Sequence, residues 1–226
     1  MISADTEQNN NDEPRQVDSE SPSTTLYMLI PPSPLFAAHW SLFLPDILPY
    51  DPRTRRHEES NLGTRIHVTG DRLKGFQLEI VRQYNFRKDR AVAFNRRFPI
   101  GTVPGEHVHR VNSLQEDDAA KQQTCKKKDE DEGGGFVDNT PLNAFEQVCV
   151  DIEAPGPSLK SVSASGGTLS VGTGKRVKSE IRDCQWWARQ VVQELCCKDL
   201  IKPLPPSKDS HEAKSPIEVV NHLPKN

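Results

Sequence analysis

The sequence is poor in apolar residues and contains no long apolar run. Apolar side chains occupy 34% of the 226 positions, which is low for a chain that packs along its whole length. No run approaches the roughly 18 apolar residues that cross a bilayer, so no membrane span is expected. The N-terminus also lacks the basic start and the apolar core of a signal peptide. We therefore expect a soluble, cytoplasmic protein.

Cysteine and net charge are low as well. The five cysteines are an odd number and include no Cys-x-x-Cys pair, so we expect reduced thiols and no structural zinc site. The formal net charge of −3 argues against a dedicated nucleic-acid-binding protein. The segment Gly172–Lys175 lacks the rest of a phosphate-binding loop. We therefore expect no cofactor.

The sequence is rich in proline, with 18 residues, and in charged residues, at 27%. Polar, proline-containing ends predict disordered tails at residues 1–24 and 203–226, because such segments bury too little apolar surface to fold. Two low-complexity inserts are predicted at 111–140, a charge block followed by three glycines, and at 160–175, rich in Ser, Gly and Thr. A single domain of residues 25–202 contains both inserts.

Short apolar runs bounded by turn residues predict an antiparallel sheet. The runs cover residues 26–30, 39–44, 63–71, 76–81, 98–103 and 145–152. Pro45 is expected to end the second run, and a Gly-Asp turn after the third run favours a hairpin with the fourth. Because side chains alternate between the faces of a strand, His39, Ser41 and Phe43 should share one face.

A helix is predicted from Asp183 to about Leu200. Asp183 suits the N-cap, since its carboxylate accepts hydrogen bonds from the amides of the first turn. An apolar stripe at helical spacing is formed by Trp187, Ala188, Val191, Val192 and Leu195. Cys184 shares this inward face and lies in the first turn, where the helix dipole favours a thiolate. The alternative is that Cys184 is a small buried apolar residue. The predicted fold class is α+β, with the sheet packed against this cysteine-bearing helix.

A thiol nucleophile needs a base, and the base needs a partner that orients it. His39 and His67 are the two histidines inside apolar strand patterns. We therefore expect Cys184 as nucleophile, His39 as base and His67 as its orienting partner, although the two histidine roles are interchangeable. Gln185 or backbone amides would stabilise an oxyanion, with Asp183 in support. The triad residues are also potential zinc ligands, but their spacing does not select a metal, so the triad is preferred.

Residues 82–97 combine six basic residues with three aromatic ones. This combination can bind single-stranded nucleic acid. The rest of the chain supplies no basic field, however. We therefore expect a solvated loop that places some aromatic side chains on the core, and no nucleic-acid partner.

Several short motifs resemble known families. The segment Asp183–Trp187, Asp-Cys-Gln-Trp-Trp, looks like the Asp-Cys-Ser-Gly-Phe start of the NlpC/P60 nucleophile helix. It is also similar to the Asn-Cys boxes of the lecithin:retinol acyltransferase group and of the PPPDE isopeptidases. His39, followed by Trp, and His67, between Ile and Val, resemble the histidine strands of the acyltransferases. The histidines precede the cysteine, as in the circularly permuted branch of this superfamily.

The wider pattern is similar to a family of small uncharacterised fungal proteins. Its elements are His-Trp-x-Leu-Phe, Gly-Thr-x-Ile-His-Val-x-Gly-Asp, Gly-Thr-Val, Ala-Pro-Gly-x-Ser-Leu and Asp-Cys-Gln-x-Trp, spread over about residues 26–200. The resemblances imply a permuted papain-like (NlpC/P60-like) fold and a cysteine-dependent hydrolase or acyl transferase. Its substrate would be an amide, isopeptide or ester in a protein, a peptide or a small acyl compound.

The C-terminal tail departs from part of this resemblance. Acyltransferases that act on membrane lipid usually carry an apolar C-terminal anchor, whereas this tail is polar and proline-rich. A lipid substrate is therefore disfavoured. The alternative function is a non-catalytic interaction or accessory protein that retains the fold, with Cys184, His39 and His67 as core residues.

Overall fold

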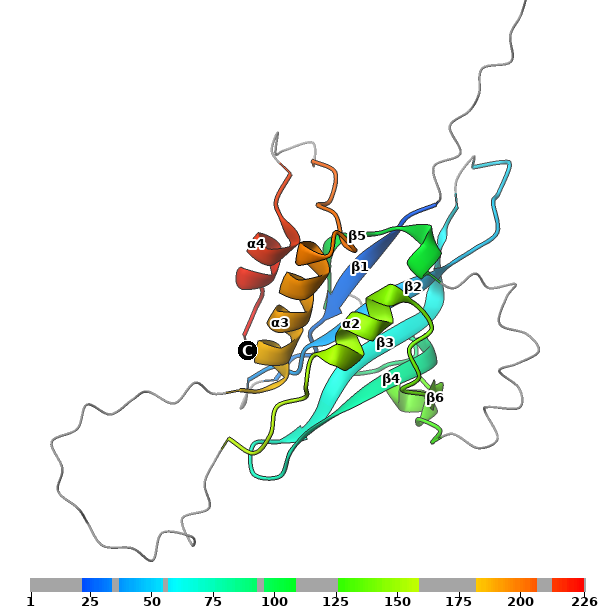
Figure 1. The fold of residues 1–226 in the computed structure, drawn as a ribbon. Helices are drawn as coiled ribbons and strands as arrows, with labels where there is room; N and C mark the ends of the chain where they lie inside the picture. The colour runs from blue at the N-terminus through cyan, green and yellow to red at the C-terminus, as the bar shows by residue number, and fades with distance from the viewer. Residues whose placement is uncertain are drawn as a thin grey trace, which may run out of the picture.

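A six-stranded antiparallel sheet forms the centre of the molecule (Figure 1). This computed structural model describes residues 22–33, 37–54, 57–92, 96–108, 126–158, 182–206 and 213–225. The strands are β1 (Thr24–Leu29), β2 (Ser41–Ile47), β3 (Glu59–Asp71), β4 (Gly75–Asn85), β5 (Arg97–Val103) and β6 (Phe136–Val137). Their order across the sheet is β5-β1-β2-β3-β4-β6, and each neighbouring pair is antiparallel. The predicted antiparallel sheet and the hairpin of its third and fourth strands are confirmed.

Helices cover one face of this sheet (Figure 1). The α-helices of the described residues are α2 (Ala144–Asp151), α3 (Cys184–Cys197) and α4 (Pro216–Asn221), with short 3₁₀ turns at Gly105–His107 and Glu130–Glu132. Helices α2 and α3 pack on the sheet, and α4 lies beside α3. The predicted helix is present, with Asp183 as its N-cap. The class is therefore α+β with a cysteine-bearing helix on the sheet.

Apolar residues divide between the two faces of the sheet. The main core lies under the helices and joins Leu42 and Ile66 of the strands to Trp187 of α3. A smaller cluster on the other face contains Leu29, Phe43, Val81, Tyr84 and Val92. Since Ile66 and Val68 of β3 both belong to the main core, His67 between them points to the other face.

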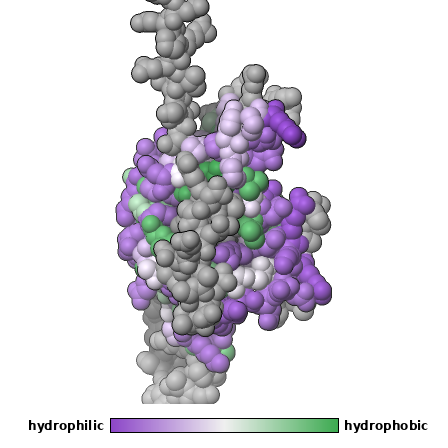
Figure 2. Space-filling view, turned by 90° about the vertical axis from the view of Figure 1, so that its right-hand side faces the viewer, coloured by the Kyte–Doolittle hydropathy of each residue, from purple (hydrophilic) through white to green (hydrophobic). Residues whose placement is uncertain are grey.

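The surface is mainly polar on the side shown in Figure 2, where hydrophobic residues form small, separate patches. The large hydrophobic side chains exposed on the described residues are Tyr50, Leu62, Leu73, Leu142 and Ile217. They come from five separate parts of the chain. Within the described ranges, no helix has both the length and the apolar character needed to cross a membrane.

Strand β2 continues through Pro45, which was wrongly expected to end it. Pro45 pairs with Gly63 of β3, and the register then shifts before Ile47 pairs with Glu59. Such an irregularity accommodates proline because the ladder of hydrogen bonds is already interrupted there. A Cβ added at Gly63 would lie only 2.3 Å from the carbonyl oxygen of Leu44, so glycine permits the close approach of the two strands.

Helix α2 replaces the strand that was predicted for residues 145–152. Asn143 caps this helix, because its side chain accepts a hydrogen bond from the amide of Glu146. The buried apolar positions of the helix are Phe145, Val148 and Cys149. The alternation of Val148, Val150 and Ile152 suggested a strand. The buried positions Phe145, Val148 and Cys149 instead follow the three- and four-residue spacing of a helix, and Val150 is only partly buried. Cys149 is thus a buried thiol of a helix, not of a strand.

Parts of two segments that were predicted to be disordered are folded. Within the 111–140 insert, residues 126–140 contain a 3₁₀ turn and β6, which pairs with β4. Within the 203–226 tail, Val220 and Leu223 are buried in the main core. Both segments were predicted to be disordered from their average composition. Such an average does not show a few apolar residues that can pack against a core formed by the rest of the chain.

Three further predictions fall partly or wholly outside the described residues. The N-terminal tail 1–24 lies outside them up to residue 21, and the insert 160–175 lies outside them entirely. The 82–97 segment begins within β4, where Arg82 forms a buried ion pair with Glu146 of α2. The side chain of Arg82 therefore helps to attach α2 to the sheet.

Candidate functional site

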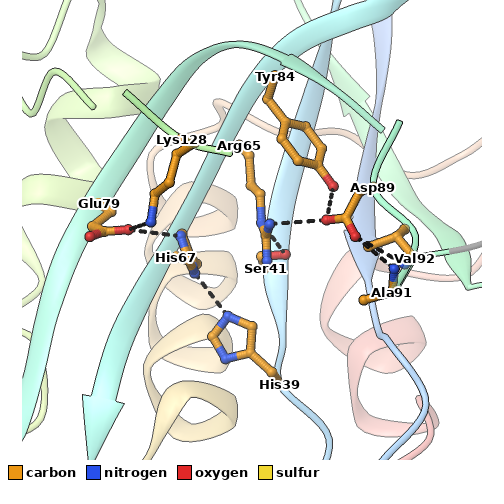
Figure 3. A network of polar contacts seen from close by, with 10 residues as sticks. All are labelled: His39, Ser41, Arg65, His67, Glu79, Tyr84, Asp89, Ala91, Val92 and Lys128. Atoms are coloured by element: carbon orange, nitrogen blue, oxygen red, sulfur yellow. Dashed lines mark hydrogen bonds and ion pairs between the residues drawn. The ribbon is translucent and has the colours of Figure 1, made fainter. Parts of the chain in front are cut away.

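Two histidines meet on the sheet face opposite α2 and α3. His39 Nε2 and His67 Nδ1 are 2.8 Å apart, and the two rings meet edge to face. His67 Nε2 lies 3.5 Å from Glu79 Oε2, and Lys128 Nζ lies 2.6 Å from that same oxygen. Figure 3 shows this chain of contacts. The structure thus brings together the two predicted histidines and adds Glu79 and Lys128 to them.

The register of the β3–β4 hairpin places Glu79 beside His67. Asp71 pairs with Gly75 at the turn, and the same uninterrupted register pairs His67 with Glu79. Directly opposed residues of antiparallel strands project from the same face. Sequence reasoning missed Glu79, although the position of the turn and the alternation of β3 carry the signal. Lys128 gave no such signal, because it lies in a charge block of the insert.

Burial keeps both imidazoles neutral near pH 7. It lowers the pKa of His39 to about 3, with the neighbouring His67 adding to the effect. Burial likewise lowers the pKa of His67 to about 4, although the neighbouring carboxylate of Glu79 opposes the change. The pKa of Glu79 is held well below its usual range by His67 and, in addition, by Lys128. A charged carboxylate therefore stands at the end of two neutral rings.

Cys184 opens helix α3 beside the main chain of Trp40. Its side chain is only 8% exposed. Burial raises the pKa of its thiol, the Asp183 charge adds to the rise, and the backbone amide of Trp40, directed at the sulfur, opposes it. Burial thus outweighs the helix dipole that was expected to favour a thiolate. Because Trp40 follows His39 directly, the sulfur lies next to the residue that follows its predicted base.

The two ring nitrogens of His39 have different surroundings. Nε2 is directed at His67, and Nδ1 is on the side of the ring turned away from it (Figure 3). The carboxylate of Glu79 only accepts hydrogen bonds, which favours a proton on His67 Nε2. His67 Nδ1 then accepts from His39 Nε2–H, and His39 Nδ1 is left as an unprotonated acceptor. This arrangement prepares Nδ1 to receive a proton.

A cavity of about 340 Å³ lies beside the histidine pair. In addition to the two histidines, its walls include Arg65, Thr69, Tyr84, Asp89 and Lys128. The described residues that line it do not include Cys184, which belongs to the main core on the helix side. The structure therefore joins His39 to His67 on one face of the sheet and places Cys184 against the main chain at the start of β2.

Arg65 and Asp89 form a fixed polar wall of this cavity (Figure 3). Arg65 Nη1 lies 3.2 Å from Asp89 Oδ2, and Arg65 Nε donates to Ser41 Oγ at 3.1 Å. The Tyr84 hydroxyl donates to the same Asp89 oxygen at 2.7 Å. Burial raises the pKa of Tyr84, so its hydroxyl remains a donor. These opposite charges satisfy each other and hold the wall in place.

The two residues predicted to support an oxyanion, Gln185 and Asp183, are instead engaged in structural contacts. The Gln185 amide donates to the carbonyl oxygens of Ala38, at 2.9 Å, and of Lys225, at 3.0 Å. Asp183 caps α3 and also pairs with Arg72 at 2.8 Å. The donors directed at the Cys184 sulfur are backbone amides.

The residues also considered as zinc ligands do not meet as a metal cluster in the part of the chain that the structure describes. His39 and His67 bond to each other, while Cys184 lies on the helix side. No group of three or more His, Cys, Asp and Glu side chains within the described ranges is arranged to hold a metal ion.

A family model matches most of the chain. It is described as a family of unknown function, DUF6540, and it matches residues 26–202. No curated protein and no solved structure matches the chain significantly. The matched range contains the histidine pair, α2 and α3, and it ends before α4.

Proposed function

The chain belongs to the DUF6540 family, whose function is unknown, and we propose that it is a cysteine-dependent hydrolase or acyl transferase. Cys184 attacks the carbonyl carbon of an amide, isopeptide or ester, His39 is the base, and His67 orients His39. The permuted papain-like fold implied by the sequence motifs is part of the same proposal. The substrate is a protein, a peptide or a small acyl compound.

One observation carries the proposal. The side-chain amide of Gln185, the residue after Cys184, donates to the carbonyl oxygen of Ala38, the residue before His39, at 2.9 Å, and His39 itself bonds to His67. The residues next to the proposed nucleophile and next to the proposed base are thus in direct contact, which supports the assignment of His39 as the base of Cys184. The proton arrangement inferred above adds support, because it leaves His39 Nδ1 free of a proton.

The proposed reaction proceeds by ordinary acyl transfer. His39 Nδ1 takes the thiol proton as the Cys184 sulfur bonds to the carbonyl carbon. Backbone amides near the sulfur stabilise the oxyanion. The tetrahedral intermediate then collapses, its C–N or C–O bond breaks, and protonated His39 gives the proton to the leaving group. Water or another acceptor attacks the acyl-enzyme in the same way and releases Cys184.

Both reacting groups are neutral in the closed structure. Burial raises the pKa of the Cys184 thiol and lowers that of His39 to about 3. Moving a proton from sulfur to imidazole is therefore unfavourable as long as the site stays dry. Activity requires a change that hydrates the thiol or stabilises the ion pair.

The competing function is a non-catalytic interaction protein. The raised pKa of Cys184 and its place in the main core, away from the cavity, favour this alternative. Under it, Cys184 is a packing residue and the histidine pair only stabilises the sheet.

The pH dependence of Cys184 alkylation separates the two functions. Peptide mass spectrometry follows Cys184 in the wild type and in His39→Ala, with the exposed Cys197 as a reference in the same sample. A positioned base contributes at least about a hundredfold to a catalysed proton transfer. Alkylation needs only the thiolate, so we set a lower threshold: His39→Ala should slow the alkylation of Cys184 near pH 7 by at least about tenfold relative to Cys197. His57→Ala is the matched control, because His57 is exposed and its ring contacts Tyr50 and the carbonyl oxygen of Leu48, not the pair.

An unchanged Cys184 rate in His39→Ala at every pH would refute the assignment of His39 as base. The His57→Ala protein should behave as the wild type. If it slowed alkylation to the same extent as His39→Ala, the effect would belong to histidine loss in general and not to the pair.

A further inference from the structure

The last described segment, residues 213–225, packs on the helix side of the sheet and ends against Ala38, Trp40 and Gln185; we name it the C-terminal strap. It lies beyond the family match, which ends at residue 202. Ser215 and Glu218 form a capping box that starts α4. Figure 1 shows the chain leaving α4 and ending beside the first turn of α3. A segment outside the family core thus reaches the turn that carries Cys184.

Val220 and Leu223 anchor the strap in the main core, with Pro216 buried and Val219 packed beside them. Val220 and Leu223 are 2% and 7% exposed and belong to the same core cluster as Cys184. The other side of α4 faces solvent, where Ile217 is 37% exposed. The strap is therefore attached by one face of a six-residue helix and by the hydrogen bonds of its end, and such a local unit can open without unfolding the sheet.

The end of the strap forms hydrogen bonds with residues next to both candidate reacting groups. The carbonyl oxygen of Lys225 accepts from the Ala38 amide at 2.9 Å and from the Gln185 side-chain amide at 3.0 Å. The carbonyl oxygen of Pro224 accepts from the indole N–H of Trp40 at 3.1 Å. Ala38 and Trp40 flank His39 in sequence, and Gln185 follows Cys184.

These hydrogen bonds recognise main chain and not side chains. The acceptors are the backbone carbonyls of two successive residues, and the Lys225 side chain is exposed to solvent. Main-chain hydrogen bonds to an extended segment are how many proteins bind peptides of varied sequence. Leaving these buried donors without acceptors would cost free energy. The carbonyl oxygens of another extended chain could take the place of those of Pro224 and Lys225.

We propose that Ala38, Trp40 and Gln185 form a subsite that binds an extended peptide main chain, and that the C-terminal strap occupies it as an internal inhibitor. The strap must leave before another peptide binds. As a substrate site, this subsite rests on the proposed function, and it selects peptide or isopeptide substrates over esters of small compounds. Departure of the strap also hydrates Cys184, which removes the main cause of its raised pKa.

Full-length variants test the strap. Leu223→Ser removes one anchor and alters no residue of the sheet, α2 or α3, whereas Ile217→Ser alters the solvent-facing side of α4. Because burying a leucine side chain stabilises by an amount equal to roughly a 10- to 100-fold change in an equilibrium, Leu223→Ser should speed Cys184 alkylation by roughly that factor. The buried Cys149 of α2 reports global unfolding and should keep its rate, and Ile217→Ser should match the wild type.

A peptide added in trans gives the second measurement. A synthetic peptide of residues 213–226 should restore the protection of Cys184 in Leu223→Ser, whereas the same peptide with serine at both apolar anchors should not. An unchanged Cys184 rate in Leu223→Ser, an equal rise at Cys149, or absence of peptide protection would each overturn the proposal.

Access and chemistry are measured separately. The effect of the strap is the ratio of the Cys184 alkylation rate in Leu223→Ser to that in the wild type. This ratio should be the same when both proteins also carry His39→Ala. Loss of the His39 dependence with the strap ratio intact would remove the proposed catalysis and leave the peptide subsite. The opposite pattern would remove the strap and leave the catalysis.

Discussion

Acidification should destabilise this protein through its histidine pair well before its carboxylates titrate. The pKa values of His39 and His67 in the folded protein are about 3 and about 4, against about 6.5 in an unfolded chain. Below pH 6.5 the unfolded chain therefore binds more protons than the folded protein. The free energy of unfolding must fall as the pH decreases through this range.

The magnitude follows from the width of the range. Each imidazole costs about 1.4 kcal/mol per pH unit while the pH lies between its two pKa values. From pH 7 to pH 5 this amounts to about 2 kcal/mol for each ring and about 4 kcal/mol for the pair. Glu79 adds nothing in this window, because its pKa is lowered and its carboxylate is charged in both states.

Urea denaturation at several pH values, followed by tryptophan fluorescence, measures this slope. The double variant His39→Gln, His67→Gln should lose the dependence between pH 7 and pH 5, while His57→Gln should retain it. A wild-type change below about 0.5 kcal/mol over this range, which is the scale of ordinary surface effects, would refute the reasoning. So would a double variant with the slope of the wild type.

Two further predictions concern the elements that support the site. Gly133 has φ +91°, and an added Cβ would lie 2.2 Å from a ring carbon of Tyr84, so Gly133→Ala should lower stability by more than about 1 kcal/mol. Gly156→Ala, where no described atom lies within 4 Å of an added Cβ, should change stability by less than about 0.5 kcal/mol, and thermal unfolding compares the two. Asp183→Ala should cost about 1 kcal/mol through loss of the α3 N-cap, whereas Asp183→Asn keeps a capping oxygen and loses only the charge pair with Arg72. Equal losses in urea denaturation would assign the effect to the ion pair and not to the cap.

Local patterns predicted much of the sheet and the cysteine-bearing helix. The Asp183 cap and the apolar stripe of α3 depend on residues within a few positions of each other, so the sequence displays them directly. Alternation within β3 also placed His67 on the face opposite Ile66 and Val68, and the structure shows it bonded there to His39, its expected partner. The role of Cys184 as a nucleophile stays a prediction.

The errors arose where two local patterns fit equally well or where a few anchors decide the outcome. Helix α2 was predicted as a strand because Val148, Val150 and Ile152 alternate. Its buried positions, Phe145, Val148 and Cys149, have helical spacing at the same time. The folded part of the insert and α4 were predicted to be disordered, because composition averages over single anchors such as Leu223. In each case, contact with a distant part of the chain selected the structure.

The sequence by itself determined the antiparallel strands, the capped helix with Cys184 in its first turn, and the face of β3 that carries His67, because these depend on short-range spacing. Tertiary structure alone decided the Lys128 contact with Glu79, the burial that raises the pKa of the thiol, and the place of the strap beside Cys184. Each of these features depends on contacts between residues that are far apart in the chain. Short-range sequence patterns do not determine such contacts or the burial that they cause.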